Sequence, residues 1–300
     1  MCPTIAAWVL AFPLTPLVWA QAQVHASEPQ EHAGDQASVD VLVSGDRAAA
    51  PNLTAADFSI SQDGAVQKID SVSHPKNSAK HVVLYLDTGA MNADDRSASA
   101  SAANHLVEKI ASASGYVAVA AMRTAGALMV QEFTNSVEVS RAAITTAIES
   151  ADLPLNQLRI GPMRYALSDS FAEICRSLGD LPGRKLIILF GTYYSEGGAI
   201  KACNRADVAI YCMVGWFSPL PVVRPSPPKS EVADETGGEA FWVNPDLNKA
   251  LDAVIASYVD SYRVFFTPPP ATAGSCHALQ VSVNVRGLAA RARNEYCTGR

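Results

Sequence analysis

The sequence lacks the short motifs by which several large enzyme classes are identified. It contains no Gly-x-Ser-x-Gly, no P-loop and no dinucleotide-binding glycine fingerprint. Four of its six histidines lie in the region expected to be ordered, and they show no metal-binding spacing: His74, His81, His105 and His277. The residues therefore give no positive ground for an enzyme, and we predict a non-enzymatic protein without a cofactor.

Excess positive charge is also missing. The 23 lysines and arginines are outnumbered by 29 aspartates and glutamates, for a formal net charge of -6. Binding to nucleic acid or to anionic membranes depends on clustered positive charge, so neither is expected as a partner. With 49% hydrophobic residues, the 300-residue chain can bury a sizeable core in one large domain or two modest ones.

The N-terminal residues carry no charge and too short an apolar run to span a membrane. Residues 1–22 include the apolar run 5–12 and end in Ala20-Gln21-Ala22, a small-x-small pattern. A spanning helix needs roughly 20 apolar residues, so we predict a cleaved signal peptide over 1–22 and a secreted or periplasmic protein without a membrane span. Residues 23–37 are polar and featureless, and we predict a disordered leader there.

Signal removal would leave five cysteines in an oxidising compartment: Cys175, Cys203, Cys212, Cys276 and Cys297. Disulfides are expected in such a compartment, and an odd count leaves at least one thiol without an intramolecular partner. The pairing of the first three remains open.

Apolar strands alternate with helical patterns over residues 79–262, which predicts an α/β domain with a mainly parallel sheet covered on both faces. The predicted strands are Val82–Leu86, Tyr116–Met122, Leu128–Phe133, Lys185–Leu189, Val208–Val214 and Glu239–Val243. The predicted helices are Ala93–Ser112, Arg141–Ala151, Pro162–Leu178, Ala199–Arg205, Lys229–Thr236 and Asp246–Tyr262. Residues 115–122 and 127–133 form an antiparallel hairpin in this interpretation.

Shorter β segments flank that domain. Residues 38–75 show strand-like alternation at Val39, Val41 and Val43, and residues 263–300 return to strands that we expect to pack against the first segment. Folding the C-terminal strands about Arg286-Gly287 sets Val281 opposite Ala292 and Cys276 opposite Cys297. Opposed residues are near disulfide range, so we predict a Cys276–Cys297 bridge. Arg291 and Arg293 would then form a solvated face.

The apolar run 82–86 ends in Asp87-Thr88-Gly89, and two unrelated kinds of protein place such a triplet at a strand end. In aspartic proteases the triplet is Asp-Thr-Gly, but catalysis in these enzymes needs two carboxylates about 3 Å apart. The sequence contains no second copy, so a protease would have to be a symmetric dimer. Von Willebrand factor A domains begin a metal site at the same place.

The chain resembles the VWFA-related domain family of secreted, Acidobacteria-type bacterial proteins over nearly its whole mature length. The matching pieces, in order, are residues 53–58 with Asp63-Gly64, residues 83–88, 184–189, 205–211, 234–238 and 285–293. The resemblance implies a Rossmann-like von Willebrand A domain with a small β subdomain built from both ends of the chain. It also implies an adhesion site made by an Asp-x-Ser-x-Ser loop, a distant threonine and a distant aspartate.

The ligand set of that metal site is largely missing here. Asp87 matches the first acid, but Gly89 and Met91 stand at the serine positions, the threonine position falls at or near Gly161, and Gly191 replaces the second acid. A hard divalent cation takes about six oxygen ligands, so we predict no bound metal. Asp94 and Asp95 instead suit the start of the following helix.

These patterns predict a secreted protein-interaction module with a degenerate, metal-free adhesion site and an unknown protein partner. Its binding surface would comprise Asp87, Thr88, Arg164, Thr192, Tyr193 and Trp216, at the strand ends where open α/β sheets bind ligands. The alternatives are metal-dependent adhesion, with Mg²⁺ or Mn²⁺ bound through Asp87, and a dimeric aspartic protease.

Overall fold

The structure is a computed structural model whose described residues all belong to one compact unit, Asp35–Arg300. It describes residues 36–45, 52–74, 80–88, 91–123, 126–149, 169, 171–191, 197–214, 230–242, 247–259 and 261–298. The predicted signal peptide lies outside these ranges. Of the predicted leader, Ala37 already belongs to strand β1 and is buried. None of the described helices is long and apolar enough to cross a membrane.

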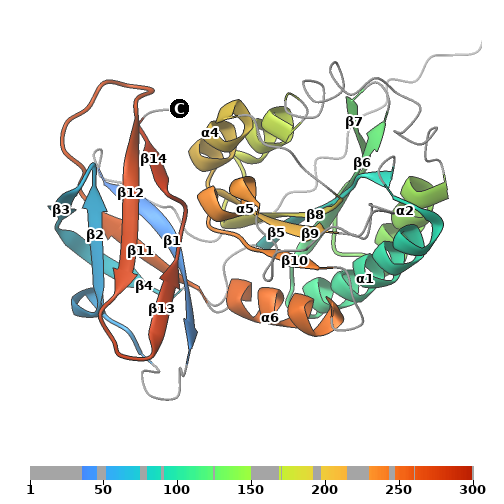
Figure 1. The fold of residues 1–300 in the computed structure, drawn as a ribbon, viewed down its shortest axis with the longest axis horizontal. Coiled ribbons are helices and arrows are strands. Elements are labelled where there is room, and N and C mark those ends of the chain that lie inside the picture. The colour runs from blue at the N-terminus through green and yellow to red at the C-terminus, as the bar shows by residue number, and fades with distance from the viewer. Residues whose placement is uncertain are drawn as a thin grey trace, which may run out of the picture. The chain divides into compact units, whose positions relative to one another are not determined.

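A six-stranded sheet forms the centre of the α/β part (Figure 1). Its strands, in spatial order, are β10 (Ala240–Trp242), β9 (Val208–Val214), β8 (Arg184–Phe190), β5 (Lys80–Leu86), β6 (Tyr116–Arg123) and β7 (Gly126–Thr134). All neighbouring pairs are parallel except β6 and β7, which are antiparallel. The predicted mainly parallel sheet, with its antiparallel hairpin, is confirmed.

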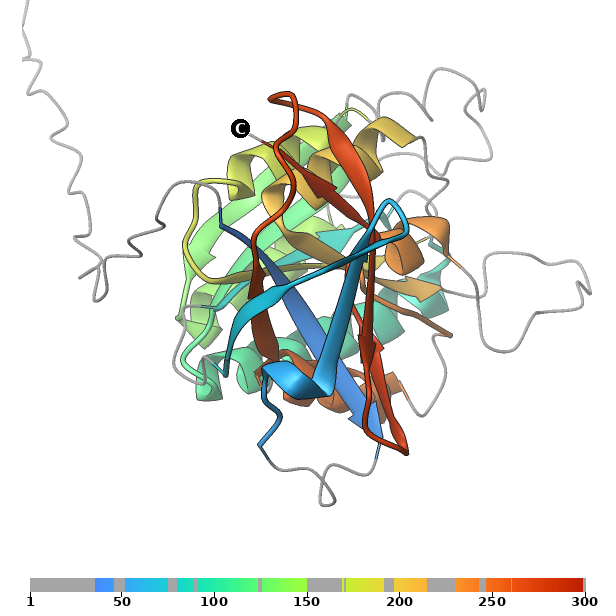
Figure 2. The same cartoon turned by 90° about the vertical axis from the view of Figure 1, so that its left-hand side faces the viewer.

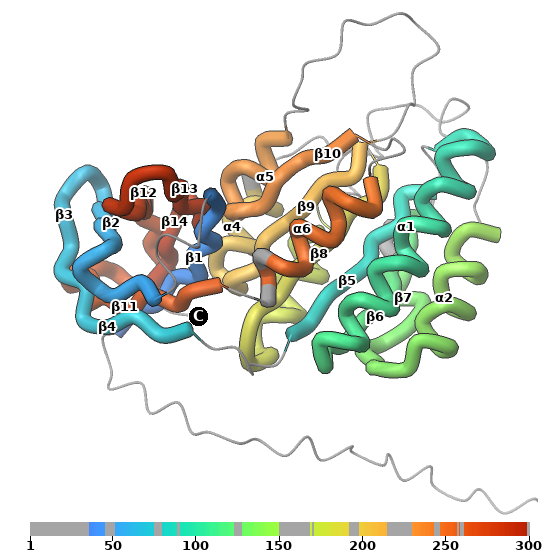
Figure 3. The backbone as a smooth tube through the Cα atoms, turned by 90° about the horizontal axis from the view of Figure 1, so that it is seen from below, coloured from blue at the N-terminus to red at the C-terminus, as the bar shows by residue number. Residues whose placement is uncertain are grey.

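Helices cover both faces of this sheet, which gives the α/β part a Rossmann-like arrangement (Figures 1 and 3). On one face lie α1 (Ala93–Ser112), α2 (Val137–Glu149) and α6 (Leu247–Val259). On the other lie the helical residues 171–178, α4 (Gly197–Ala206) and α5 (Glu231–Glu235).

The alternation within β5 explains why two helix layers are needed. Val82, Leu84 and Leu86 enter the core shared with α1, α2 and α6, whereas Val83 and Tyr85 enter the core on the opposite face. Every residue of β5 is buried. A strand with both sides apolar is stable only in the middle of a sheet with helices on both faces.

The remaining strands form two four-stranded sheets that enclose a third core (Figure 2). The first has the order β13 (Leu288–Arg291), β1 (Ala37–Gly45), β11 (Tyr262–Phe266) and β4 (Ile69–Ser73). The second has the order β14 (Glu295–Cys297), β12 (Cys276–Val283), β2 (Phe58–Gln62) and β3 (Ala65–Gln67), with the short 3-10 helix η2 (Ala55–Asp57) before β2. Strands from both ends of the chain therefore pair with one another.

Strand β11 corrects the predicted end of the last helix. The helix was expected to reach Tyr262, but α6 ends at Val259 and Tyr262 begins the strand. Tyr262, Val264 and Phe266 are buried while the residues between them are partly exposed. This period of two belongs to a strand, and pairing with β1 and β4 satisfies its backbone.

The C-terminal segment is not the single hairpin that the register predicted. Cys276 does pair with Cys297, but further along β12 pairs with β2, so Val281 lies opposite Ile60 instead of Ala292. Strand β13 pairs with β1 in the other sheet. An isolated two-stranded hairpin is marginal, whereas separate pairing lets the apolar residues of β12 and β13 line one core from two sheets.

Two cysteine pairs are bonded in the structure, Cys175 with Cys203 and Cys276 with Cys297. The first joins the helical residues 171–178 to α4, and the second joins β12 to β14. Cys212 is a buried free thiol, and burial raises its pKa to about 12. Disulfide pairing agrees with an oxidising compartment.

We expect replacement of Cys175 and Cys203 together by Ala to lower the free energy of unfolding by about 3 kcal/mol, because the bridge restricts the unfolded chain. Urea unfolding measures this loss. The matched control, Cys212→Ala, breaks no bridge and should cost much less. Thiol labelling of the unreduced, urea-denatured mature chain should modify Cys212 alone; labelling of Cys175 or Cys203 would contradict the pairing.

Candidate functional site

Asp87 and Thr88 lie where the central strand β5 ends, at the carboxyl edge of the parallel sheet. The backbone N–H of Asp87 donates to the carbonyl of Phe190 on the neighbouring strand at 2.9 Å. The Asp87 residue is 3% exposed and Thr88 is fully buried. The two side chains therefore lie beneath the surface, and they do not themselves offer a partner much area to contact.

Gly191 closes the space beside Asp87. Its φ of +149 is one that side-chain-bearing residues rarely adopt, and a Cβ atom built on it would lie 2.6 Å from the Cβ of Asp87. This is the position where the family pattern places its second acid. No carboxylate side chain fits there without moving the end of β5 or β8.

The acids that follow Asp87 serve the start of α1. The side chain of Asn92 caps the helix by accepting from the backbone N–H of Asp95 at 2.8 Å, and Asp94 and Asp95 occupy the first turn. Carboxylates there complement the helix dipole, as predicted from the sequence.

Within the described residues, Asp87 belongs to no group of three side chains able to hold a metal ion. The one such group is Cys276, Glu295 and Cys297, and its two sulfur atoms are joined in a disulfide. The other predicted surface residues, Arg164, Thr192, Tyr193 and Trp216, lie outside the described ranges.

A second polar site lies at the opposite end of the sheet, where β8 and β9 begin. Three guanidinium groups and two carboxylates meet there, and we call them the arginine layer: Arg184, Arg263, Arg293, Asp40 and Asp207. They come from β8, from β1 and β11, from the turn before β9 and from the chain between β13 and β14. The arginine layer thus contains residues of the six-stranded sheet and of the flanking β strands. No site was predicted there from the sequence.

Asp40 and Arg263 are cross-strand partners on β1 and β11. The Arg263 Nε and Nη2 atoms donate to the two carboxylate oxygens of Asp40 at 2.8 and 3.0 Å. Burial alone would raise the pKa of Asp40, but the charge and hydrogen bonds of Arg263, together with the charges of Arg184 and Arg293, outweigh it and hold that pKa below its usual range. Asp40 is thus a paired anion, and removing either partner would leave a buried charge.

Arg293 is not on a solvated face, which corrects the sequence-based expectation. Its side chain is 9% exposed and lies 3.2 Å from the carboxylate of Asp207. Its Nη1 donates to the carbonyl of Asn204 at 2.6 Å, and its Nη2 donates to the carbonyl of Ser38 at 2.8 Å. The prediction was wrong because β13 pairs with β1, which turns the following residues toward α4 instead of solvent.

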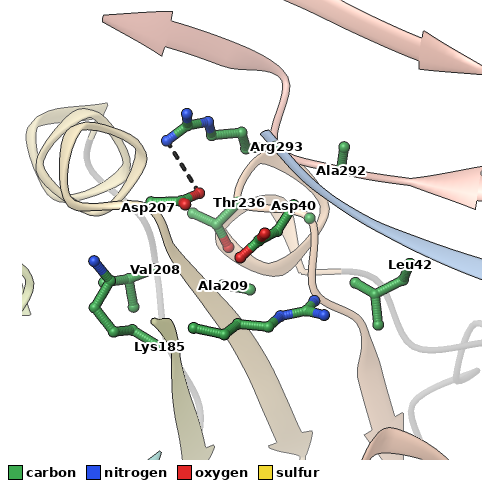
Figure 4. Close-up of a pocket in the computed structure, with 11 residues that line it drawn as sticks. Asp40, Leu42, Lys185, Asp207, Val208, Ala209, Thr236, Ala292 and Arg293 are labelled. Carbon is green, nitrogen blue, oxygen red and sulfur yellow. Dashed lines mark ion pairs between the residues drawn. The ribbon is translucent and has the colours of Figure 1, made fainter. Parts of the chain in front are cut away.

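A cavity of about 20 Å³ lies among these residues, lined by Asp40, Arg184, Asp207, Thr236 and Arg293 together with Lys185 and smaller groups. Figure 4 shows the labelled side chains around it, with the ion pair between Arg293 and Asp207 as a dashed line. Asp40 lies between Val39 and Val41 on the strand face turned away from the β core, a position that alternation alone assigns to solvent.

A third polar group, in the β strands, has the connectivity of a nucleophile, a base and an acid. The Ser275 Oγ and the His277 Nε2 lie 2.9 Å apart, and the His277 Nδ1 lies 2.7 Å from the Asp63 carboxylate. The second carboxylate oxygen of Asp63 accepts from the backbone N–H of Ala278 at 2.9 Å. The hydrogen bond from His277 lowers the pKa of Asp63.

The turn around Ser275 lacks the rest of an acyl-transfer site. The Ser275 hydroxyl lies 2.7 Å from the carbonyl of Thr272, which can only accept and so competes for its proton. The backbone N–H groups of Gly274, Ser275 and Thr298 all donate to carbonyls within this turn. Oxyanion stabilisation is usually the largest part of such catalysis, and these amides do not supply it. The group ties the β2–β3 turn to β12.

Comparison with known proteins leaves the family open. No family model matches the chain, and no curated protein matches it. Among solved structures, it is similar to an aerotolerance-related membrane protein from Bacteroides fragilis NCTC 9343, with a TM-score of 0.41 and 16% identity over 60% of this chain and 98% of that one.

Two further solved structures show weaker similarity. The human COPII-coat protein Sec24c has a TM-score of 0.33 and 11% identity over 74% of this chain, which spans 44% of that chain. The TFIIH p34 N-terminal domain has a TM-score of 0.37 and 11% identity over 59% of this chain and 96% of that one. Similarity at this level assigns neither a family nor a function.

We expect Gly191→Ala to lower the free energy of unfolding by roughly 2–3 kcal/mol, since the new Cβ both overpacks against Asp87 and imposes an unfavourable φ. Urea unfolding measures the change. Gly198→Ala is the matched control, because that glycine lies in α4 with no atom within 4 Å of the added Cβ. It should be neutral or stabilising by up to about 1 kcal/mol. Equal stability of the two variants would contradict the close packing of Gly191 on Asp87.

Proposed function

We propose that the chain is a secreted, non-enzymatic protein-interaction module of the von Willebrand A type whose adhesion site has lost its metal. The observation that carries this proposal is the contact between Gly191 and Asp87 at the carboxyl ends of β8 and β5. This contact lies at the end of a central parallel strand, which is where von Willebrand A domains have their adhesion site. It leaves no room for the second acid of that site.

The ligand chemistry at this strand end supports a metal-free site. Asp87 contributes one buried carboxylate and Thr88 one buried hydroxyl. A cation that takes about six oxygens would have to draw nearly all of them from water. Such an ion would add little to folded-state stability or to partner recognition.

Recognition is then expected from side chains on the loops around this edge. Ligands of open α/β sheets bind beyond the carboxyl ends of the strands, and Arg164, Thr192, Tyr193 and Trp216 lie on the segments that follow or precede these strand ends in the sequence. Aromatic and arginine side chains are the residue types that most often dominate protein interfaces. Secretion is supported by the uncharged N-terminal segment and by the two bonded cysteine pairs.

The protease alternative has little support in this geometry. Asp87 stands at the end of a strand in a parallel sheet and is followed by helix α1, whereas two copies would need their carboxylates about 3 Å apart to share a proton. At 3% exposure, Asp87 is too deeply buried to meet the same residue of a second chain.

The metal-free part of the proposal predicts that excess Mg²⁺ or Mn²⁺ leaves the thermal unfolding midpoint unchanged. A ligand that binds only the folded state must raise that midpoint, so differential scanning calorimetry of the mature chain with and without each cation decides the question. Asp87→Asn, which keeps the side-chain shape, is the control. A rise in the wild type that this variant lacks would favour metal-dependent adhesion.

The interaction part predicts that a photo-crosslinking amino acid in place of Tyr193 or Trp216 gives the same discrete protein adduct in an extract of the native compartment. Excess unlabelled protein should compete for that adduct, and the double variant Tyr193→Ala, Trp216→Ala should compete poorly. Val66, 82% exposed on β3, is the control position for nonspecific capture. Equal adducts from position 66 would argue against a recognition surface at the strand ends.

A further inference from the structure

The two disulfides differ in how easily a reductant can reach them. Cys276 and Cys297 are both partly exposed, whereas Cys175 and Cys203 are each 0% exposed. A disulfide is reduced when a thiolate reaches one of its sulfur atoms, so access decides which bond opens first. A dithiol reductant that acts on the folded chain is therefore expected to open Cys276–Cys297 and to leave the buried bond closed.

Hydrogen bonds on both sides of the exposed cysteine pair hold β14 against β12 (Figure 1). On one side the backbone N–H of Leu279 donates to the carbonyl of Asn294 at 2.7 Å, and on the other the N–H of Thr298 donates to the carbonyl of Ser275 at 2.8 Å. The hydroxyl oxygens of Ser275 and Thr298 also lie 3.0 Å apart. None of these bonds involves sulfur, so the two thiols of the reduced form stay opposite each other on one face of the strand pair.

Glu295 adds a carboxylate to that face. It lies two residues before Cys297 in β14, and side chains two apart in a strand point the same way. One of its carboxylate oxygens and the two sulfur atoms all lie within 4.8 Å of one another. The Glu295 Oε2 is inaccessible to solvent and has no hydrogen-bond partner in the part of the chain that the structure describes. Native structures rarely leave such an atom unsatisfied, so this oxygen is available to a ligand.

The charges around this carboxylate favour a cation. Burial, together with the negative charges of Glu231 and Glu295, raises the pKa of Glu235, so these acids lie close enough to repel one another. Two thiolates would add further negative charge beside Glu295. A divalent cation bound there would offset this repulsion.

Two thiolates and one carboxylate form a ligand set that suits zinc. Zn²⁺ binds four ligands in a tetrahedron and accepts sulfur as well as oxygen. Thiolates select such borderline-soft metals, whereas Mg²⁺ and Ca²⁺ take oxygen ligands. A water molecule would complete the fourth position.

We propose that reduction of the Cys276–Cys297 bond creates a zinc site in which Cys276, Cys297 and Glu295 bind the ion. A dithiol reductant supplies two electrons and two protons; it becomes a disulfide while the S–S bond of the chain breaks and two thiols form. Zn²⁺ then displaces one proton from each thiol, and both protons pass to solvent. Metal binding here depends on the redox state of the chain, and it is independent of the metal-free adhesion site proposed at the carboxyl edge of the six-stranded sheet.

Selective reduction is tested on the folded mature chain with limiting dithiothreitol, followed by alkylation and mass spectrometry. We expect Cys276 and Cys297 to be alkylated while Cys175 and Cys203 remain joined. Opening of the Cys175–Cys203 bond first, or at the same rate, would overturn the proposal.

Metal binding is tested with Co²⁺, which occupies tetrahedral zinc sites and absorbs light when it binds thiolates. After reduction and removal of the dithiothreitol without oxygen, Co²⁺ should produce a thiolate-to-cobalt charge-transfer band that saturates at one ion per chain, and Zn²⁺ should abolish that band. The oxidised chain is the matched control, because Cys212 is a free thiol in both forms and its contribution cancels. A reduced chain without the band would overturn the site.

Glu295→Gln tests the third ligand, because the amide keeps the shape of the side chain and removes its charge. The variant keeps both disulfides, so it can fold in the oxidised form and be reduced afterwards. We expect it to bind Co²⁺ more weakly by at least about tenfold, since even an outer-shell partner of a metal ligand contributes that much. Glu108→Gln is the control, because Glu108 has an exposed side chain on α1 and pairs with Arg141. Equal affinities of the two variants would show that Glu295 does not bind the ion.

Discussion

The arginine layer is the constraint on which the rest of this architecture depends. It stands where β1 and the C-terminal strands meet the amino ends of β8 and β9, and it holds charges from separate stretches of the chain. A buried charge that loses its partner is strongly destabilising, so the Arg293–Asp207 ion pair favours the joint placement of the C-terminal strands and the start of β9. The layer therefore makes the flanking sheets part of the same unit as the α/β sheet.

The two ends of the six-stranded sheet consequently have different physical characters. At the amino ends of the strands, two ion pairs lie between Arg263 and Asp40 and between Arg293 and Asp207, and the second joins the C-terminal strands to the start of β9. At the carboxyl ends, Asp87 and Thr88 are buried beside Gly191, and within the described residues Asp87 belongs to no group of three side chains able to hold a metal ion. The recognition surface that we propose belongs to the carboxyl end of the sheet, where loops on an α/β scaffold commonly bind ligands.

The sequence was sufficient to predict those strands and helices whose local hydrophobic pattern agrees with their burial in the structure. The run Val82–Leu86 could only be a central strand, and α1 has the predicted bounds Ala93–Ser112 because the acids after Asn92 and its apolar spacing favour the same start. Local pattern did not identify the strand partners: β12 and β13 could pair with each other or with β2 and β1, and their apolar residues face the same core in either case. Arg293 was misplaced for that reason, and the layer with it, since its members lie far apart in the sequence.

Native-state hydrogen exchange tests most directly whether the arginine layer makes one cooperative unit. We predict that the amides of Val41 in β1, Ile187 in β8 and Ile210 in β9 exchange with the same free energy of opening and the same dependence on urea, because the buried charges prevent one sheet from opening alone. If Val41 opened at a clearly lower free energy while Ile187 and Ile210 stayed protected, the flanking sheets would be separable and the arginine layer would not hold the molecule together as one unit.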